Sequence, residues 1–284
     1  MCALALLTLW VYWGSLSGFW LYEDVPAVGW TGWSFVPRGL TTATMQWQAG
    51  QSVEAHHAVS LGLHLLNGLL IAAIGRWTPI AVFLTGVWWL HPIQTESVAY
   101  LSSRADLLLV TCVLLGIWSK RTALLWACVA IWVKESGVMV GPLLWLWHGQ
   151  RRLLVPIVMG LIWGVWIWPA MGTWTPPSGD SALWYAAVQS AALWRGLSQL
   201  IWPFGLTVLY DWPTVDPIWP LWASGGAVAL LLAGLRPRWR LACWWPLVAL
   251  APRFLVRLPD YLHDHHLPLA FLGLVLVGFR KDDC

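Results

Sequence analysis

The sequence predicts an all-α, polytopic integral membrane protein with about ten transmembrane helices and further interfacial helices on the external side. The first observation is composition: 59% of the 284 residues are hydrophobic and 10% are charged, whereas a soluble domain carries about 25% charged residues. The second is the 27 tryptophans, whose indole rings favour the headgroup level of a bilayer. The third is a series of apolar runs separated by polar turns.

A membrane-spanning helix needs about 20 apolar residues, and ten runs are candidates. In order they are Ala3–Tyr22, Ala55–Ile74, Trp77–Leu90, Leu101–Trp118, Thr122–Val133, Gly137–Trp147, Leu153–Trp168, Ile218–Leu235, Leu241–Leu255 and Leu267–Phe279. The first run has neither a basic segment before it nor a clean cleavage pattern, so we expect a retained span. The short runs flanking Lys134–Ser136 form either a hairpin or one long helix, and we favour the hairpin because the charges then sort by side.

If the N-terminus is cytoplasmic, most basic residues fall in cytoplasmic turns and most acidic residues fall on the external side. The cytoplasmic turns receive Arg76, Lys120, Arg121, Arg151, Arg152, Arg236, Arg238, Arg240, Arg280 and Lys281, the bias of the positive-inside rule. The external side receives Glu23, Asp24, Glu54, Glu96, Asp106, Glu135, Asp180, Asp211, Asp216, Asp260 and Asp264. We therefore expect a multi-pass protein of the bacterial inner membrane or the endoplasmic reticulum, with its site on the non-cytoplasmic face.

The whole chain, 1–284, is expected to form a single membrane domain. Two stretches are expected to be external loops, 23–54 and the Pro- and Gly-rich 172–217, and the apolar middle of the second, 182–202, favours an interfacial helix over a further crossing. The net charge of +3 is too small to indicate nucleic acid. Five scattered cysteines predict neither a disulfide framework nor a zinc site.

Acidic and basic residues in the first external loop suggest chemistry. Glu23 and Asp24 follow the first apolar run, where burial can tune a carboxylate as a general base; the alternative is an acidic pair marking a helix end. Arg38 can grip a phosphate with two hydrogen bonds or extend toward lipid headgroups. His57 and His64 are seven residues apart and so share a helix face, as core hydrogen-bonders or as ligands.

The stretch His91–Asp106, "HPIQTESVAYLSSRAD", interrupts the apolar pattern. His91 with Glu96 is the obvious candidate pair for a metal. Arg104 either holds loops together through Asp106 or Glu96, or faces a polar cavity, since a charge at the bilayer centre costs about 2.5–3.5 kcal/mol. Lys134 can meet a phosphate or simply pair with Glu135. A late cluster, "LPDYLHDHHL", adds His265 within a group of titratable side chains.

Taken in order, these segments resemble the GT-C class of membrane glycosyltransferases. The similarity is greatest to the protein O-mannosyltransferase branch that carries tetratricopeptide repeats, although this sequence shows no such repeats. The segments are "LYEDVPAV", "HHAVSLGLHLLNGLL", "HPIQTESVAYLSSRADLL", "VKESGVMVGPLL", "FGLTVLYDWP" and, more loosely, "LPDYLHDHHLPLAFLGL". The family's first acidic position is usually Asp, where this chain has Glu23, and the family's Arg-Pro-Leu corresponds here to "VPRGL".

The resemblance implies a GT-C-like fold and transfer of a hexose, mannose in that branch, from a polyprenyl-phosphate donor to an acceptor hydroxyl of a protein or a surface glycan. Asp24, or Glu23, would be the base, and Arg38 and Lys134 would contact the donor phosphate. The other candidate substrate-binding residues are His57, His91, Glu96, Arg104, Glu135 and His265. No cofactor is required, because the leaving phosphate is already a stable anion, and a divalent cation remains open. The alternatives are a non-catalytic polyprenyl-lipid flippase or transporter and an inactive membrane scaffold.

Overall fold

The computed structural model describes residues 1–18, 38–167, 182–206, 218–255 and 267–278. In these ranges the chain is helical throughout, without strands, which confirms the all-α part of the prediction. The α-helices are α1 (Cys2–Val11), α3 (Gly39–Gln46), α4 (Val53–Ile74), α5 (Pro79–Leu90), α6 (Thr95–Ala99), α7 (Arg104–Trp118), α8 (Ala123–Val133), α9 (Val140–His148), α10 (Val155–Ile167), α11 (Ala182–Gln199), α12 (Ile218–Ala233), α13 (Arg240–Leu255) and α14 (Leu267–Val277). Short 3-10 helices are η1 (Trp13–Ser17), η2 (Pro92–Gln94), η3 (Leu101–Ser103), η4 (Glu135–Met139), η5 (Arg151–Leu154) and η7 (Pro237–Trp239).

The prediction of a polytopic, GT-C-like bundle of about ten transmembrane helices is wrong. Among the described residues, only two helical segments are long and apolar enough to cross a membrane, Val53–Ile74 and Leu101–Trp118. The second is η3 continued by α7. These two candidate spans pack against each other and are the part of the membrane prediction that the structure retains.

The other apolar runs form helices, but short ones. The helices α5, α8 and α9 contain 12, 11 and 9 residues. At about 1.5 Å rise per residue, even the longest of them reaches only about 18 Å, against a hydrocarbon core of about 30 Å. Each ends where the sequence provides a stop: His91 and Pro92 after α5, Lys134 after α8, and Gly149 in the left-handed region after α9, at φ 72°. Apolar composition therefore overstated the number of crossings.

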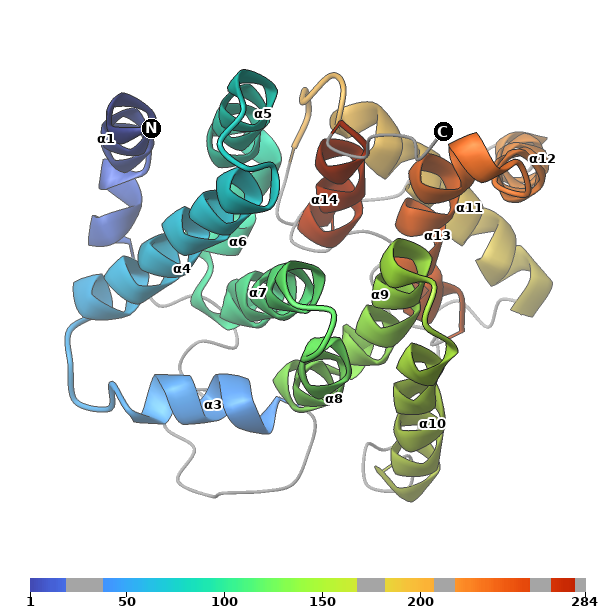
Figure 1. Cartoon of the computed structure of the whole chain (residues 1–284), viewed down its shortest axis with the longest axis horizontal. Coiled ribbons are helices and arrows are strands. Elements are labelled where there is room, and N and C mark those ends of the chain that lie inside the picture. The colour runs from blue at the N-terminus through green and yellow to red at the C-terminus, as the bar shows by residue number, and fades with distance from the viewer. Residues whose placement is uncertain (19–37, 168–181, 207–217, 256–266, 279–284) are drawn as a thin grey trace.

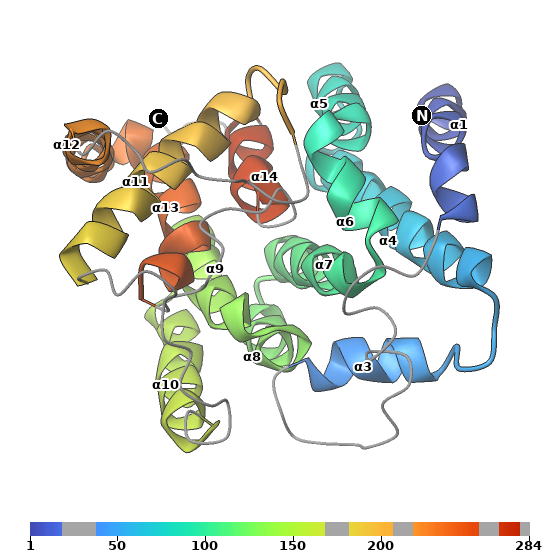
Figure 2. The same cartoon turned by 180° about the vertical axis from the view of Figure 1, so that it is seen from behind.

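The helix α7 lies in the middle of the molecule (Figures 1 and 2) and packs on α4, α8, α9 and α14. Most of its apolar side chains are buried, and Val110, Val113 and Leu114 are fully buried. His148 at the end of α9 donates through Nε2 to the Gly116 carbonyl near the end of α7, at 2.9 Å, so the C-terminal ends of these two helices lie side by side. The chain accordingly turns back between α8 and α9, as the hairpin interpretation of Lys134–Ser136 predicts.

Helices α4 and α5 are joined by two reciprocal hydrogen bonds. His64 Nε2 donates to the Trp89 carbonyl and Trp89 Nε1 donates to the His64 carbonyl, both at 3.1 Å. Gly68, one turn further along α4, makes this approach possible, because a Cβ there would lie 2.0 Å from Trp89 Nε1. The two histidines expected to share a face, His57 and His64, are both buried on α4.

Several tryptophans are core residues, which departs from the expectation that indoles gather at headgroup level. Trp88, Trp89 and Trp245 are fully buried. Trp88 stacks on Phe271 of α14 at 5.5 Å between ring centroids, and Trp245 of α13 donates to the Leu269 carbonyl of α14 at 2.8 Å. Buried indoles therefore also join helices, since each ring provides a large apolar body and one hydrogen-bond donor.

The helix α11 occupies the stretch for which an interfacial helix was predicted. It packs along α12 and contacts α13, and Trp194 of α11 donates to the Ala223 carbonyl of α12 at 2.9 Å. Most of loop 172–217 on either side of α11 and the first part of loop 23–54 lie outside the described residues. The prediction of two external loops thus stays a prediction.

Large apolar side chains point outward from several peripheral helices. Trp10 of α1 is 75% exposed, Ile162 of α10 is 67% exposed and Trp222 of α12 is 74% exposed. The helices α1 and α12 lie at opposite edges of the molecule (Figures 1 and 2). Water-soluble monomers rarely expose contiguous apolar patches of more than a few hundred Å², so these edges are suited to an apolar surrounding.

The contact between Gly68 and Trp89 predicts a specific sensitivity of the α4–α5 pair. Gly68→Ala should lower the free energy of unfolding by about 1–3 kcal/mol, because the added methyl group overlaps a ring held by hydrogen bonds. Gly62→Ala on the same helix is the matched control, since a Cβ there meets no atom within 4 Å; it should be neutral or slightly stabilising. Thermal unfolding of both variants in neutral detergent is the measurement, and equal melting temperatures would contradict the packing.

Candidate functional site

Buried polar side chains gather where five segments meet, and we call this region the polar end. The segments are α3, the N-terminal part of α4, the start of α7, the end of α8 and η4. In both views α3 lies beside the end of α8 and alongside α7 (Figures 1 and 2). The side chains of the polar end are Arg38, Thr41, Gln48, His56, His57, Ser60, Arg104, Asp106, Lys134 and Glu135. They come from parts of the sequence almost 100 residues apart.

Arg104 is the centre of the polar end. It is fully buried, and its guanidinium donates to four acceptors on α3, on α4 and in the turn between them: Ser60 Oγ at 3.3 Å, the Thr44 carbonyl at 3.3 Å, Gln48 Oε1 at 2.9 Å and the His56 carbonyl at 2.8 Å. Two of these acceptors are backbone carbonyls. The guanidinium therefore ties the backbones of α3 and α4 to α7.

Further hydrogen bonds close the region around Arg104. Gln48 Nε2 donates to the Ala55 carbonyl at 3.0 Å, and His56 Nε2 donates to the Gln48 carbonyl at 3.2 Å. Thr41 Oγ1 donates to the Val133 carbonyl at 2.7 Å, which attaches α3 to the last turn of α8. The Val133 carbonyl lies in the last turn of α8, where carbonyl groups lack partners within their own helix, and the Thr41 hydroxyl supplies one.

Lys134 and Asp106 form a buried ion pair. Lys134 Nζ lies 2.8 Å from Asp106 Oδ1 and 2.9 Å from Oδ2, and the two side chains are 7% and 10% exposed. The sequence suggested a phosphate or Glu135 as the partner of Lys134, and Asp106 or Glu96 as a partner of Arg104. In the structure the Asp106 carboxylate instead joins α7 to the end of α8 through Lys134.

Arg38 and Glu135 form a second, accessible ion pair beside the buried one. Arg38 Nε lies 3.1 Å and 3.3 Å from the two carboxylate oxygens, and the side chains are 44% and 41% exposed. An exposed ion pair stabilises a protein by at most about 1 kcal/mol, so an incoming anion can replace Glu135 at low cost. Arg38 also has a left-handed backbone, at φ 73°, a conformation that costs a non-glycine residue about 1–3 kcal/mol and is frequent at functional sites.

His57 lies at the side of the polar end toward η1, and Glu96 lies on the neighbouring helix α6, which contacts α4, α7 and η1. His57 is 1% exposed and Glu96 is 8% exposed. Gly18, the residue that follows η1, packs against the His57 ring, since a Cβ on Gly18 would lie 2.9 Å from His57 Nε2. Nearby, burial raises the pKa of Tyr12 to about 12, against a smaller opposing effect of its hydrogen bond with Thr95. Tyr12 therefore keeps its proton at neutral pH.

His91 lies away from the polar end. Its Nδ1 accepts from the Ile93 backbone N–H at 3.1 Å, its Nε2 donates to the Leu200 carbonyl at 3.2 Å, and its ring lies 4.6 Å from that of Phe271. Both ring nitrogens are used in joining the turn after α5 to the end of α11. We therefore assign His91 to the packing of the two halves of the chain and not to the polar end.

The other predicted site residues divide into two groups. Arg38, His57, Glu96, Arg104, Lys134 and Glu135 lie in or beside the polar end, whereas Glu23, Asp24 and His265 lie outside the described residues. Sequence reasoning missed the importance of Gln48 and Ser60, which are 2% and 0% exposed. For Ser60 its position among the apolar residues of α4 was the available signal, but nothing in the sequence indicated that Gln48 would meet an arginine 56 residues away.

Within the described ranges, no three side chains of His, Cys, Asp or Glu are close enough together to hold a metal ion. The suggested pair of His91 and Glu96 has no third ligand there. The requirement for a divalent cation therefore stays a prediction to be tested.

Comparison of the chain with protein-family models, with curated proteins and with solved structures found no match.

The buried ion pair predicts a large and specific loss of stability. Asp106→Asn should lower the free energy of unfolding by about 3–5 kcal/mol, because it removes the carboxylate that pairs with the buried Lys134 ammonium. Glu135→Gln, in the exposed pair, is the control and should cost at most about 1 kcal/mol. The double variant Asp106→Leu with Lys134→Met should recover most of the loss. Denaturant unfolding measures all three, and an Asp106→Asn variant as stable as the parent would contradict the role of this pair.

The surroundings of His91 predict a pH dependence of stability. Burial lowers its pKa, partly opposed by the hydrogen bond to the Leu200 carbonyl. The unfolded chain therefore takes up a proton near pH 6.5, before the folded chain does, and the free energy of unfolding falls as the pH drops below about 6.5. His91→Asn keeps an acceptor for the Ile93 N–H and should flatten the decline between pH 7.5 and 5. Parallel stability curves for parent and variant would exclude this contribution.

Proposed function

We propose that the chain is a membrane-embedded glycosyltransferase that moves a hexose from a polyprenyl-phosphate donor to an acceptor hydroxyl at the polar end, on the non-cytoplasmic face. The observation that supports this most is the pairing at the polar end. The accessible Arg38–Glu135 pair lies beside the buried Lys134–Asp106 pair, although Arg38 and Lys134 are 96 residues apart. These are the two cations that the resemblance to GT-C enzymes assigns to the donor phosphate.

The geometry suggests different roles for the two cations. Arg38 is accessible and is held by a weak partner, so its guanidinium can exchange Glu135 for two phosphate oxygens. Lys134 forms a buried ion pair with Asp106. It would attract the donor phosphate through its nearby positive charge, without giving up Asp106. A phosphate-binding group that is already in place stabilises the charge that develops on the leaving oxygen.

The proposed reaction needs one base and no cofactor. Asp24, or Glu23, takes the proton from the acceptor hydroxyl, and the acceptor oxygen forms a bond to the anomeric carbon of the hexose with inversion. The bond from that carbon to the phosphate oxygen breaks, and its electron pair leaves with the polyprenyl phosphate. The acceptor is a protein Ser or Thr hydroxyl or a surface glycan.

Membrane placement supports a lipid-linked donor. Val53–Ile74 and Leu101–Trp118 are candidate spans, and both have their N-terminal ends at the polar end. Large apolar side chains such as Trp10, Ile162 and Trp222 are exposed on other helices and would contact lipid. A polyprenyl chain in the same bilayer would then bring its phosphate to the membrane surface.

One observation favours a second candidate, a membrane scaffold without catalysis. Arg38, Arg104 and Lys134 all have partners inside the chain, so the polar end is complete without a substrate. A scaffold would use the same contacts only to join helices. Activity measurements separate the two candidates.

Purified protein incubated with a panel of polyprenyl-phosphate sugars and acceptor peptides should consume one donor. Asp24→Asn should reduce the rate by at least about 100-fold, as expected for loss of a general base, while Arg38→Ala should mainly raise the KM for the donor. Glu54→Gln removes an exposed carboxylate and is the control with unchanged rate. Full activity of Asp24→Asn would remove that residue from the mechanism, and a parent protein that consumes no donor would favour the scaffold.

A further inference from the structure

The turn between α12 and α13 is strongly basic and lies outside the polar end. It contains Arg236, Arg238 and Arg240 within five residues, and all three side chains are exposed. Among the residues that the structure describes, none forms an ion pair with them. Three neighbouring positive charges without counter-charges create a local field that attracts an anion.

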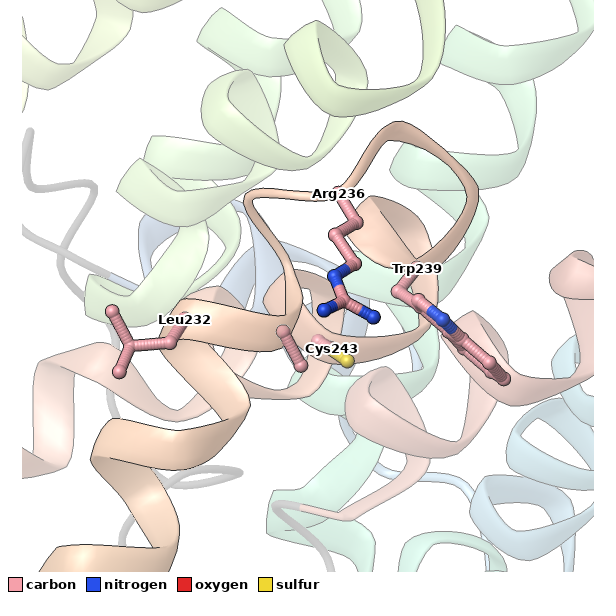
Figure 3. A pocket seen from close by; sticks show the side chains of 5 residues that line it. Leu232, Arg236, Trp239 and Cys243 are labelled. Atoms are coloured by element: carbon pink, nitrogen blue, oxygen red, sulfur yellow. The ribbon is translucent and has the colours of Figure 1, made fainter.

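A pocket of about 400 Å³ opens at this turn, lined by Leu232, Ala233, Arg236, Trp239 and Cys243. Figure 3 shows the Arg236 guanidinium directed from the turn toward Cys243 and Trp239, with Leu232 on the other side. The pocket therefore has one cationic wall and otherwise apolar or aromatic walls. Its ligand must carry a negative group next to apolar groups.

The turn is held firmly in place. Trp244 of α13 donates to the Leu231 carbonyl of α12 at 3.0 Å. A Cβ on Gly234 would lie 2.0 Å from the Trp244 ring, so only glycine allows this contact. The Arg238 guanidinium lies 5.2 Å from the centroid of the Trp239 ring, a cation–π distance that helps to position the indole. Arg236 therefore projects from a fixed frame.

We propose that this pocket binds the phosphodiester headgroup of an anionic phospholipid from the surrounding membrane. The Arg236 fork matches two phosphate oxygens, while Arg238 and Arg240 supply the excess positive charge that favours an anionic over a zwitterionic headgroup. Trp239 is 45% exposed and lies beside the guanidinium, at the level where indoles meet the glycerol region.

The apolar surface next to the pocket distinguishes a lipid from a free anion. Leu232 and Leu235 are 60% and 61% exposed, and Leu231 and Val228, on the preceding turns of α12, are 49% and 52% exposed. These side chains lead away from the pocket along α12, where acyl chains would lie. A soluble phosphate would leave this surface uncovered. The assignment depends on membrane placement and is independent of the proposed sugar transfer.

The test compares ligands on the full-length protein in neutral detergent. Dioctanoyl phosphatidylglycerol should raise the melting temperature in a saturable way, whereas dioctanoyl phosphatidylcholine and inorganic phosphate at equal concentrations should not. Arg236→Gln should weaken the apparent affinity for phosphatidylglycerol by about tenfold or more, because a charge-assisted contact is lost. Arg151→Gln, an exposed arginine in another turn, is the matched control with unchanged affinity.

A second variant keeps the test decisive if Arg236→Gln alters the fold. Leu232→Glu changes an exposed side chain in the pocket lining and should abolish the response by placing a carboxylate opposite Arg236. Equal phosphatidylglycerol affinity of parent and both variants would overturn the proposal. A response to inorganic phosphate as large as that to the lipid would overturn the lipid assignment in favour of a free-anion site.

Discussion

Burial of the Arg104 guanidinium is the constraint on which the arrangement of the first half of the chain depends. Removing an arginine from water is expensive unless all of its donors find acceptors, and the acceptors here belong to α3, to α4 and to the turn between them. The Arg104 guanidinium therefore has its hydrogen-bond acceptors only when α3 and α4 are packed against α7. The polar end follows from this requirement, because the same arrangement brings Thr41 to the end of α8 and Arg38 to Glu135.

In this protein an apolar composition does not by itself mean that a helix can cross a membrane. The chain is as apolar as a membrane protein with many crossings, yet in the described ranges only α4 and the segment formed by η3 and α7 are both long enough and apolar enough to span. The remaining apolar residues divide between buried helix contacts, as at Trp88 and Trp245, and exposed positions, as at Trp10 and Trp222. Hydropathy reports which residues avoid water, but it does not say whether they meet lipid or one another.

The helical class, most helix limits and the turn at Lys134 were predictable, because Pro, Gly and charged residues interrupt apolar runs at identifiable positions. The site was predictable only in part. Arg38, Arg104, Lys134 and Glu135 were recognisable as charges in an apolar sequence, but the partner of Lys134 was not, since Asp106 is one of several acids at helix ends. Pairing is decided by how helices pack, and helix packing depends on shape complementarity that no local pattern contains. Gln48 was missed for the same reason.

The reciprocal hydrogen bonds between His64 and Trp89 have a consequence for assembly of the protein. Each residue supplies both a side-chain donor and a backbone carbonyl acceptor to the other. Separating α4 from α5 therefore removes the partners of both side-chain donors at once, whereas the His64 carbonyl keeps its hydrogen bond within α4. In a lipid environment neither donor would find water, and the penalty would fall on both helices together. The two helices would accordingly enter the bilayer region already paired, as one hairpin. The short α5 would enter only together with the longer α4.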